Sequence, residues 1–254
     1  MKSIYEENYH SKAFVEILPD FIGWVGRRKA EGGFLKKILE KNNCRKVFES
    51  SLGDGCDSIY LLKEGFDVTS NDLDLDFIKK AQQNARNQRV KLNITSFDWR
   101  RLGTKIEKES FDAVLCLGNS LTYLFRRKDQ LKTLRQFYTI LKKNGVLLID
   151  ERNYQFFLDN SEKFLGENYV CRKKVVYCGE KVDAKPVFIS KNKIVFEYFH
   201  KEKKIKSRLI LYPFKDGELL ALLKEAGFKK IQQFSDFKKG KDNKADFFTY
   251  VAYK

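Results

Sequence analysis

Glycines and an acidic residue follow two consecutive apolar stretches in the first third of the sequence. Gly53 and Gly55 follow shortly after residues 47–51, and Asp72 stands just past residues 66–70. Glycine permits positive φ and lets a ligand approach the backbone closely. In a doubly wound sheet, such a turn meets the ligand at a helix N-terminus, and an acid after the second strand holds ribose hydroxyls. The spacing therefore predicts a nucleoside-binding site, although many turns of this kind carry glycines without a ligand.

Strands and helices alternate through the part of the chain that contains these residues. The run at 111–117 (FDAVLCL) is almost wholly apolar, which is typical of a strand buried on both faces. Alternating strands and helices form βαβ units around a mostly parallel sheet. The expected strands are 47–51, 66–70, 89–97, 111–117 and 146–150, and the expected helices are 56–64, 74–87 and 128–142.

The pattern differs on either side of this region. Two helices are expected before it, at 11–26 and 34–40, and Pro19 should kink or restart the first. After residue 152, strands without intervening helices predict an antiparallel insertion. These strands are 169–178, 193–200 and 205–213, and a helix at 218–226 and strands at 229–237 and 247–253 complete the chain, the last two as an antiparallel pair at the sheet edge.

Together these elements predict an α/β fold: a Rossmann-like doubly wound, mostly parallel seven-stranded sheet with an antiparallel β insertion and an N-terminal helical arm. The sequence has no internal repeat, low-complexity tract or clear linker. We therefore expect a single domain over residues 1–254. Its parts are an N-terminal arm at 1–43, a ligand-binding core at 44–152 and 214–254, and a substrate-side insertion at 153–213.

Composition excludes several classes of protein. A chain of 254 residues with 43% hydrophobic and 33% charged residues is typical of a globular domain. No apolar run is long enough to span a membrane, and the first ten residues are too polar for a signal peptide, so we expect a cytoplasmic protein. The cysteines are odd in number and lack a CxxC pair, which argues against a disulfide framework or a structural zinc site. They are Cys44, Cys56, Cys116, Cys171 and Cys178.

The net charge of +16 raises the alternative of a nucleic-acid partner. Most of the excess is lysine scattered along helices and turns, with one denser stretch at 201–208. No strand carries the aromatic signature of an RNA-recognition motif. The composition therefore favours a lysine-rich solvated surface over a nucleic-acid interface.

Two later segments narrow the chemistry. FDAVLCLGNSLTYL at 111–124 and GVLLIDERNY at 145–154 resemble class I S-adenosylmethionine-dependent methyltransferases, and more narrowly the glycine and glycine/sarcosine N-methyltransferases. FIGWVGRRKAEGGF at 21–34 resembles the family's N-terminal segment. KSRLILYPF at 206–214 and ADFFTYVAYK at 245–254 resemble the bacterial betaine-pathway members. The similarity covers nearly the whole chain.

The resemblance implies a cofactor, S-adenosyl-L-methionine, with S-adenosyl-L-homocysteine as product, and a small amino acid or amine as the methyl acceptor. It implies that Arg28 reaches the cofactor carboxylate, with Arg27 as the adjacent alternative, and that Arg152 grips the carboxylate of glycine or sarcosine. The implied cofactor-binding residues are Tyr9, Arg28, Glu49, Gly53, Gly55, Asp72, Leu73, Asp98, Trp99, Leu117 and Gly118. The implied catalytic residues are Asn119, Arg152, Tyr177, Tyr198 and Tyr212.

Methyl transfer to an amine explains these residue types. The reaction is an in-line displacement that needs no nucleophilic side chain, and alignment alone can supply roughly 7–11 kcal/mol. Arginine suits a carboxylate because its planar fork binds both oxygens. Tyrosine rings tolerate a cationic methyl donor, and their hydroxyls can orient the amine. We expect no metal ligands in this site.

Some residues depart from the pattern of the family that the sequence resembles. Glu49 and Asp54 stand where the family has aspartate and a small hydroxyl residue, and Asp54 should weaken cofactor binding unless a lysine or arginine offsets its charge. Tyr123 stands where the animal enzymes carry histidine, and Phe21 replaces a tyrosine. Two alternatives therefore remain open: an RNA methyltransferase that uses the basic surface, and a cofactor-binding relative with little activity. The sequence also leaves open a homo-oligomer.

Overall fold

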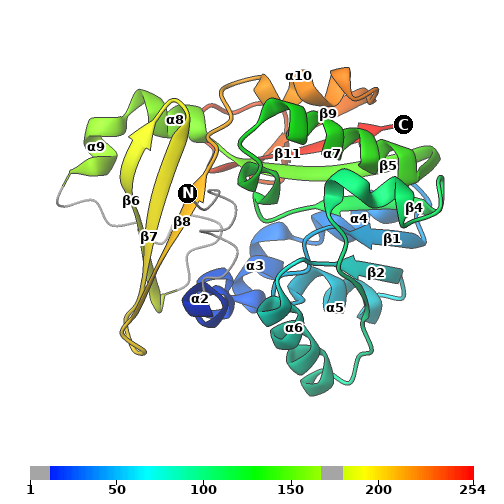
Figure 1. Ribbon diagram of the computed structural model, residues 1–254, viewed down its shortest axis with the longest axis horizontal. Coiled ribbons are helices and arrows are strands. Elements are labelled where there is room, and N and C mark those ends of the chain that lie inside the picture. Colours follow the sequence, from blue (N-terminus) through cyan, green and yellow to red (C-terminus); the bar gives the residue numbers. More distant parts are fainter. Residues whose placement is uncertain (1–11, 167–179) are drawn as a thin grey trace.

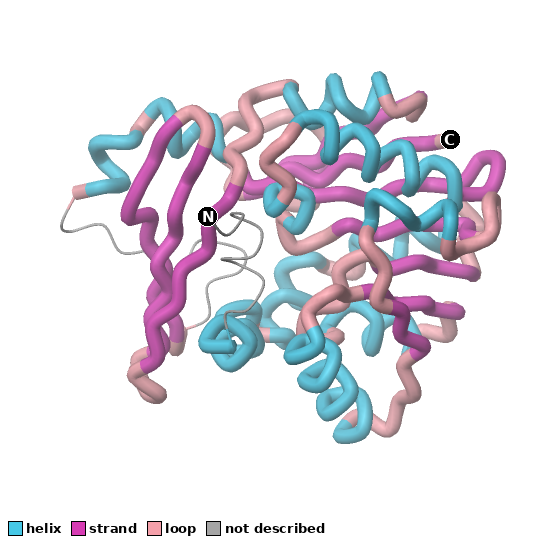
Figure 2. The backbone as a smooth tube through the Cα atoms, viewed as in Figure 1, coloured by secondary structure: helices cyan, strands magenta, loops and turns pink. Residues whose placement is uncertain are grey.

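The computed structural model describes residues 12–166 and 180–254. Its main sheet has the strand order β10-β9-β11-β5-β4-β1-β2-β3, and a second sheet has the order β6-β7-β8. Neighbouring strands from β5 to β3 are parallel, whereas β11 pairs antiparallel with both β5 and β9. Figure 2 shows the strands of the main sheet side by side and the small antiparallel sheet apart from them at one end.

The helices and strands in the described residues have these bounds. The α-helices are α2 Lys12–Ile22, α3 Trp24–Glu31, α4 Phe34–Lys41, α5 Cys56–Lys63, α6 Leu75–Asn87, α7 Arg127–Ile140, α8 Tyr154–Asp159, α9 Ser161–Leu165 and α10 Glu218–Glu225, and the 3₁₀ helices are η1 Trp99–Thr104 and η2 Ser120–Tyr123. The strands are β1 Lys46–Glu49, β2 Asp67–Asn71, β3 Asn93–Thr95, β4 Phe111–Cys116, β5 Leu141–Arg152, β6 Val182–Ser190, β7 Lys193–His200, β8 Ile205–Leu211, β9 Lys229–Ser235, β10 Lys238–Lys239 and β11 Phe247–Tyr253.

Helices cover both faces of the main sheet because its central strands are apolar on both sides. Alternate residues of a strand point to opposite faces. Phe48 and Val114 pack with α7 and α10 on one face, whereas Val47 and Leu115 pack with α4 and α5 on the other. All four of these side chains are buried. This double burial is the reason that 111–117 reads as a continuous apolar run.

The small sheet and α2 form a third apolar cluster beside the main sheet. Figure 1 shows α2 in dark blue between the yellow small sheet and the main sheet. Phe14 and Phe21 of α2 are buried against Tyr198 and Leu209 of the small sheet. These contacts make α2 one wall of the space between the two sheets.

The α/β fold with a mostly parallel sheet and an antiparallel β sheet is confirmed. The strand pair at 229–237 and 247–253 is also confirmed as antiparallel. The described residues add one short strand, β10, to the seven expected in the main sheet. The predicted strand at 169–178 lies outside the described residues.

Several predicted boundaries were wrong. The strand expected at 89–97 is shortened to Asn93–Thr95, because it is an edge strand that pairs only with β2. The strand expected at 146–150 is longer, Leu141–Arg152, so Arg152 ends the strand instead of following it. Strand β6 was not predicted, because Pro186 lies inside it and the register with β7 shifts just after the proline.

Candidate active site

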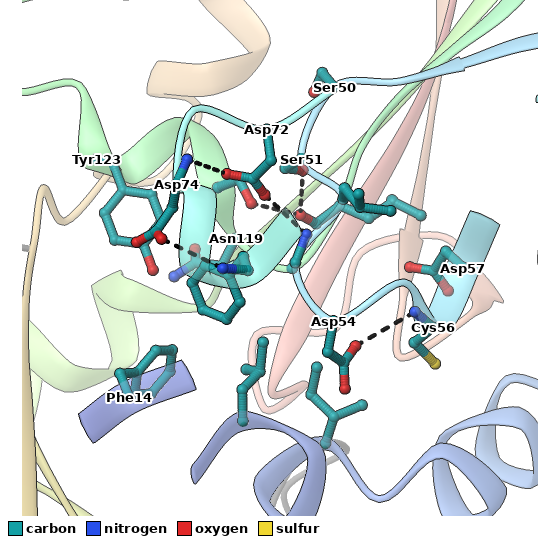
Figure 3. A pocket seen from close by; sticks show the side chains of 18 of the residues that line it. Phe14, Ser50, Ser51, Asp54, Cys56, Asp57, Asp72, Asp74, Asn119 and Tyr123 are labelled. Carbon is teal, nitrogen blue, oxygen red and sulfur yellow. Dashed lines mark hydrogen bonds between the residues drawn. The ribbon is translucent and has the colours of Figure 1, made fainter. Parts of the chain in front are cut away.

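A cavity lies at the carboxyl ends of the parallel strands, between the main sheet, α2 and the small sheet. Residues after β1, β2 and β4 meet there because parallel strands end at the same edge of a sheet. Figure 3 shows some of the lining side chains, among them Phe14 of α2, Asp72 after β2 and Asn119 after β4. The cavity is lined by Phe14, Leu18, Phe21, Ile22, Arg27, Glu49, Ser50, Ser51, Leu52, Gly53, Asp54, Cys56, Asp57, Asp72, Leu73, Asp74, Phe77, Trp99, Leu117, Gly118, Asn119, Ser120, Tyr123, Arg152, Tyr198, Leu209, Leu211 and Phe247.

Asp72 and the glycine turn are joined directly. Asp72 Oδ2 accepts a hydrogen bond from the Gly53 amide (2.9 Å), and its Oδ1 accepts one from the Asp74 amide (3.0 Å). Burial raises the pKa of Asp72 to about 6, although these amides favour the carboxylate. Each carboxylate oxygen keeps a further lone pair. The side chain can therefore accept hydrogen bonds from hydroxyl groups of a ligand in the cavity.

The two glycines of the turn differ in role. Gly53 has φ 54° and lines the cavity, and a Cβ there would lie 3.5 Å from Leu18 Cδ2, so the glycine keeps the space between the turn and α2 open. Gly55 has φ 89° but does not line the cavity. A Cβ at Gly55 would lie 3.1 Å from Ile59 and 3.3 Å from Ala81. Gly55 thus permits close packing of α5 and α6, and no ligand contact accounts for it.

Arg27, rather than Arg28, faces the cavity. Arg27 is buried, lines the cavity, and pairs with Asp57 at 2.6 Å. Arg28 does not line the cavity: it pairs with Glu31 and with Asp57, the same carboxylate that pairs with Arg27, and its guanidinium lies 4.5 Å from the centre of the Tyr60 ring. The structure therefore places Arg27 in the cavity wall and Arg28 behind Asp57, a difference between neighbouring arginines that sequence alone could not resolve.

The Asp54 carboxylate is engaged by the protein. Its Oδ2 accepts a hydrogen bond from the Trp24 indole (2.8 Å), and its Oδ1 accepts one from the Cys56 amide (3.3 Å). Burial raises the pKa of Asp54, which favours the neutral acid, while the charge of Arg27 opposes that shift. In Figure 3 the side chain points away from Asp72. The nearby Arg27 offsets the negative charge of Asp54, which would otherwise weaken cofactor binding.

Glu49 is fully buried at the floor of the cavity. It ends β1, and one of its oxygens accepts a hydrogen bond from Ser58 of α5. Burial raises the pKa of Glu49 to about 8, although Ser58 and Arg27 favour the charged form. This burial favours the protonated acid. The longer side chain is accommodated by the small residue Ser58 opposite it.

The loop after β4 is held by Asp150. The amides of Gly118 and Asn119 donate to its two carboxylate oxygens at 3.1 and 2.6 Å. The Asn119 Nδ2 group donates to the Tyr154 hydroxyl, and its Oδ1 accepts from the Arg152 amide at 3.1 Å. Asn119 adopts the left-handed conformation, φ 64°. Its side chain thus fixes the end of β5, in addition to lining the cavity.

Arg152 is a buried cation beside the same cavity. Its guanidinium carbon lies 4.6 Å from the Phe247 ring centre, 5.5 Å from Phe196 and 5.8 Å from Phe157. The residue is 8% exposed. Rings hold a guanidinium by cation–π attraction and exclude water from it, which strengthens its attraction for an anion. This arrangement suits a carboxylate ligand.

Of the predicted tyrosines that the structure describes, one lines the cavity and one does not. Tyr198 lines the cavity, but Tyr212 does not: its hydroxyl donates to Glu218 at 2.6 Å and its ring packs against Phe214. Tyr212 lies just beyond the end of β8, where the chain turns toward α10. Tyr9 and Tyr177 lie outside the described residues.

Of the residues that the resemblance implies beside the adenine base, some line the cavity and one does not. Leu73 and Trp99 line the cavity, and the Trp99 indole donates to the Ser50 carbonyl at 2.7 Å. Leu117 and Gly118, which the resemblance implies on the methionine side of the cofactor, also line it. Asp98 does not line it: the Asp98 carboxylate accepts from the Arg100 amide at 2.9 Å and pairs with the Arg100 guanidinium. Hydrogen bonds from Arg100 hold the pKa of Asp98 below its usual range. Asp98 starts a 3₁₀ helix, which is its evident structural role.

Sequence reasoning missed most of the apolar wall. These side chains come from α2, α6, the small sheet and β11, which converge only in the folded protein. Spacing of apolar residues on α2 predicted a buried face but could not tell a cavity wall from a core. The missed apolar residues are Phe14, Leu18, Ile22, Phe77, Leu209, Leu211 and Phe247.

Comparisons with known proteins identify proteins that share this fold and sequence. Residues 47–145 match a family model described as a methyltransferase domain. A crystal structure of an S-adenosylmethionine-dependent methyltransferase from Clostridium acetobutylicum ATCC 824 superposes with a TM-score of 0.73 at 18% identity, covering 94% of this chain and 97% of that one. The chain therefore has the Rossmann-like fold of these methyltransferases.

Relatives of higher identity define the family. The glycine/sarcosine N-methyltransferase of Parasynechococcus marenigrum (strain WH8102) is 35% identical over 257 residues, covering 100% of this chain and 88% of that protein. The enzyme of the same name from Aphanothece halophytica is 34% identical over 253 residues, covering 99% of this chain and 92% of that protein. The chain belongs to the glycine/sarcosine N-methyltransferase family.

Proposed function

We propose that the protein is an S-adenosyl-L-methionine-dependent methyltransferase that methylates the amino nitrogen of glycine, sarcosine or a related small amino acid. The carrying observation is Arg152, a buried cation ringed by aromatic side chains in the same cavity as Asp72. Arg152 suits the carboxylate of an amino acid, and Asp72 suits a pair of ribose hydroxyls. The full-length relatives named for this activity support the acceptor class.

The cavity residues fit the proposed cofactor. Asp72 offers free lone pairs for the ribose hydroxyls, and the open turn at Gly53 admits a ligand against the backbone. Arg27 lines the cavity beside that turn and suits the cofactor carboxylate. Leu73 and Trp99 provide apolar surface for the base. When bound, S-adenosylmethionine supplies an electrophilic methyl group on a sulfonium centre.

The protein's own contribution is binding and alignment. Arg152 fixes the acceptor by its carboxylate, which leaves the nitrogen of a small amino acid free to face the cofactor half of the cavity. Asn119 holds the end of β5 through the Arg152 amide and so fixes the position of this arginine. The walls exclude water from the nitrogen. Such positioning can supply roughly 7–11 kcal/mol of the barrier without a nucleophilic side chain.

We also propose the division into an arm at 1–43, a core at 44–152 and 214–254, and an insertion at 153–213. The cavity draws its lining from all three parts.

A cytoplasmic location is proposed on the composition alone. None of the helices in residues 12–166 and 180–254 has the length and apolar character of a membrane span.

A labelled-methyl assay tests the proposal. Purified full-length protein is incubated with S-adenosylmethionine labelled at the transferred methyl group, together with glycine, sarcosine or methylamine. We expect label in the amino acids and none in methylamine, which lacks the carboxylate that Arg152 would bind. Absence of label from every amino acid, in protein that binds the cofactor in a calorimetric titration, would overturn the acceptor class.

A further inference from the structure

An aromatic wall borders the acceptor half of the cavity. It consists of Phe14, Phe21 and Tyr198, and all three are buried and line the cavity. The Tyr198 ring centre lies 5.0 Å from Phe14 and 5.0 Å from Phe21, both in edge-to-face contact. Rings in mutual contact at these distances hold one another in fixed orientations. The wall is therefore a preformed surface.

The aromatic wall connects the two halves of the cavity. At one end, Tyr198 lies 6.4 Å from Phe196, whose ring lies 5.5 Å from the Arg152 guanidinium. At the other end, Phe14 lies 6.4 Å from Phe77 of α6, the helix that follows Asp72. An acceptor held by Arg152 and aligned with a cofactor over Asp72 would place its nitrogen beside these rings.

Polar groups near this position are already used within the protein. Asn119 Oδ1 accepts from the Arg152 amide, and Asn119 Nδ2 donates to the Tyr154 hydroxyl. On the side of α2 the wall offers Phe14 and Phe21, which have no hydrogen-bonding atoms in their side chains, and Leu209 and Leu211 extend the apolar surface. Tyr198 and Tyr123 also line the cavity and each carries one hydroxyl group. A nitrogen beside Phe14 and Phe21 therefore meets mainly carbon.

The chemistry of the acceptor nitrogen then decides which substrate fits. A primary amine has two N–H groups to satisfy, and unpaired N–H groups are costly in a buried site. An N-methyl group instead contacts the rings, and the positive charge that develops on a methylated nitrogen is stabilised by aromatic faces. Methyl contacts of this kind change selectivity by about 10-fold or more.

We propose that the aromatic wall makes this protein select acceptors whose nitrogen already carries a methyl group, so that sarcosine and N,N-dimethylglycine are methylated in preference to glycine. Phe14, Phe21 and Tyr198 are the specificity-determining residues. This inference rests on the proposed function, since it concerns the same site and the same reaction.

The test compares kcat/KM for glycine, sarcosine and N,N-dimethylglycine with the wild-type protein under one set of conditions. We expect kcat/KM for sarcosine to exceed that for glycine by about 10-fold. A ratio below about three overturns the inference and leaves the proposed function intact. Absence of methylation of all three acceptors overturns both.

Two variants then assign the selectivity to the wall. Phe14→Leu and Tyr198→Leu remove one ring each, and each should lower the ratio of sarcosine to glycine about three-fold or more. Phe188→Leu is the matched control, because Phe188 is 45% exposed and does not line the cavity. A wild-type preference that survives both ring deletions in folded protein would overturn the role of the wall. The wild-type ratio still tests the preference if a variant fails to fold.

Discussion

Arg27 and Arg152 are buried arginines that reach one cavity from different elements. Arg27 comes from α3 and Arg152 from the end of β5. A buried guanidinium is costly unless anions or rings surround it. Arg27 has Asp57 at 2.6 Å, and Arg152 has three rings within 5.8 Å. Each environment can therefore keep its cation in place until a ligand carboxylate arrives.

Arg152→Lys should raise the KM for the amino-acid acceptor about 10- to 100-fold, with little change in the cofactor Kd. Lysine keeps the charge but loses the planar fork that binds both carboxylate oxygens. Steady-state kinetics and a cofactor titration measure the two effects separately. Arg208→Lys is the control, because this arginine is exposed and pairs with Glu197. Equal effects on acceptor and cofactor would contradict the role of Arg152.

Arg27→Lys and Arg28→Lys distinguish the two neighbouring arginines. We expect the cofactor Kd to rise about 10-fold in the first variant, because a charge-assisted hydrogen bond is weakened, and less than about two-fold in the second. Isothermal titration calorimetry with S-adenosylhomocysteine measures both values. A larger effect at Arg28 than at Arg27 would restore the assignment that the sequence resemblance favoured.

At the scale of elements, α2 is joined to the small sheet by a polar cluster outside the cavity. His200 of β7 is fully buried; its Nδ1 accepts from the Lys203 amide (3.2 Å), so the neutral ring donates from Nε2 to Asp20 (2.9 Å). Lys203 Nζ also donates to Asp20 (3.0 Å). Partial burial alone would raise the pKa of Asp20, but these hydrogen bonds outweigh it and lower that pKa. Asp20 thereby anchors the helix that carries Phe14 and Phe21.

Asp20→Ala should loosen α2 while the main sheet stays intact. The change leaves the buried His200 ring without its acceptor, at about 1–3 kcal/mol, and also removes an acceptor of the exposed Lys203, so amides of 12–22 should exchange with solvent about 10-fold faster. Hydrogen exchange followed by mass spectrometry measures this. Asp183→Ala is the control, since Asp183 pairs with Lys201 on the same sheet. Unchanged exchange in α2 would exclude an anchoring role for Asp20.

The sequence predicted elements better than it predicted which side chains meet. Apolar runs such as 111–117 depend on neighbours along the chain, so the parallel strands and Asp72 at the end of β2 could be placed in advance. Contacts between Phe14 and Tyr198 join residues far apart in the chain, and no local pattern specifies them. For the same reason the sequence could not show that the side chains of Arg28 and Tyr212 lie outside the cavity lining: the direction of a side chain depends on the packing of its whole element.

At the scale of the whole molecule, some of the basic side chains are paired with acids. In the dense stretch at 201–208, Lys201, Lys203 and Arg208 lie within 3.0 Å of carboxylate oxygens. Pairing of this kind leaves less positive charge for a phosphate backbone. We expect an RNA mobility shift, if present at low salt, to vanish at about 150 mM salt. A shift that survives this salt would favour the RNA methyltransferase alternative.

Stability should depend on the buried acid Glu151. Its Oε1 accepts from Tyr250 at 2.8 Å, whereas its Oε2 has no hydrogen-bond partner among the described residues. Burial raises the pKa of Glu151 to about 8, well above its value of about 4.3 in an unfolded chain. Between these values the folded protein holds a proton that the unfolded chain has lost. The free energy of unfolding should therefore fall as the pH rises from about 4.5 to about 8.

Glu151→Gln should remove this pH dependence, because glutamine keeps a hydrogen-bonding partner for Tyr250 without titrating. Relative to wild type, the variant should gain a few kcal/mol of stability between pH 5 and pH 8. Urea unfolding at several pH values measures the difference. Glu162→Gln on α9, where the residue is exposed, is the control. A constant difference between wild type and Glu151→Gln across this range would contradict the prediction.

The central claim is that one cavity aligns a nucleoside cofactor with an amino-acid carboxylate. A crystal structure of the full-length protein with S-adenosylhomocysteine and sarcosine tests this most directly. We expect the ribose hydroxyls on Asp72, the sarcosine carboxylate on Arg152, and the sarcosine nitrogen between them beside Phe14. Electron density for sarcosine away from Arg152, or for the nucleoside away from Asp72, would contradict the account.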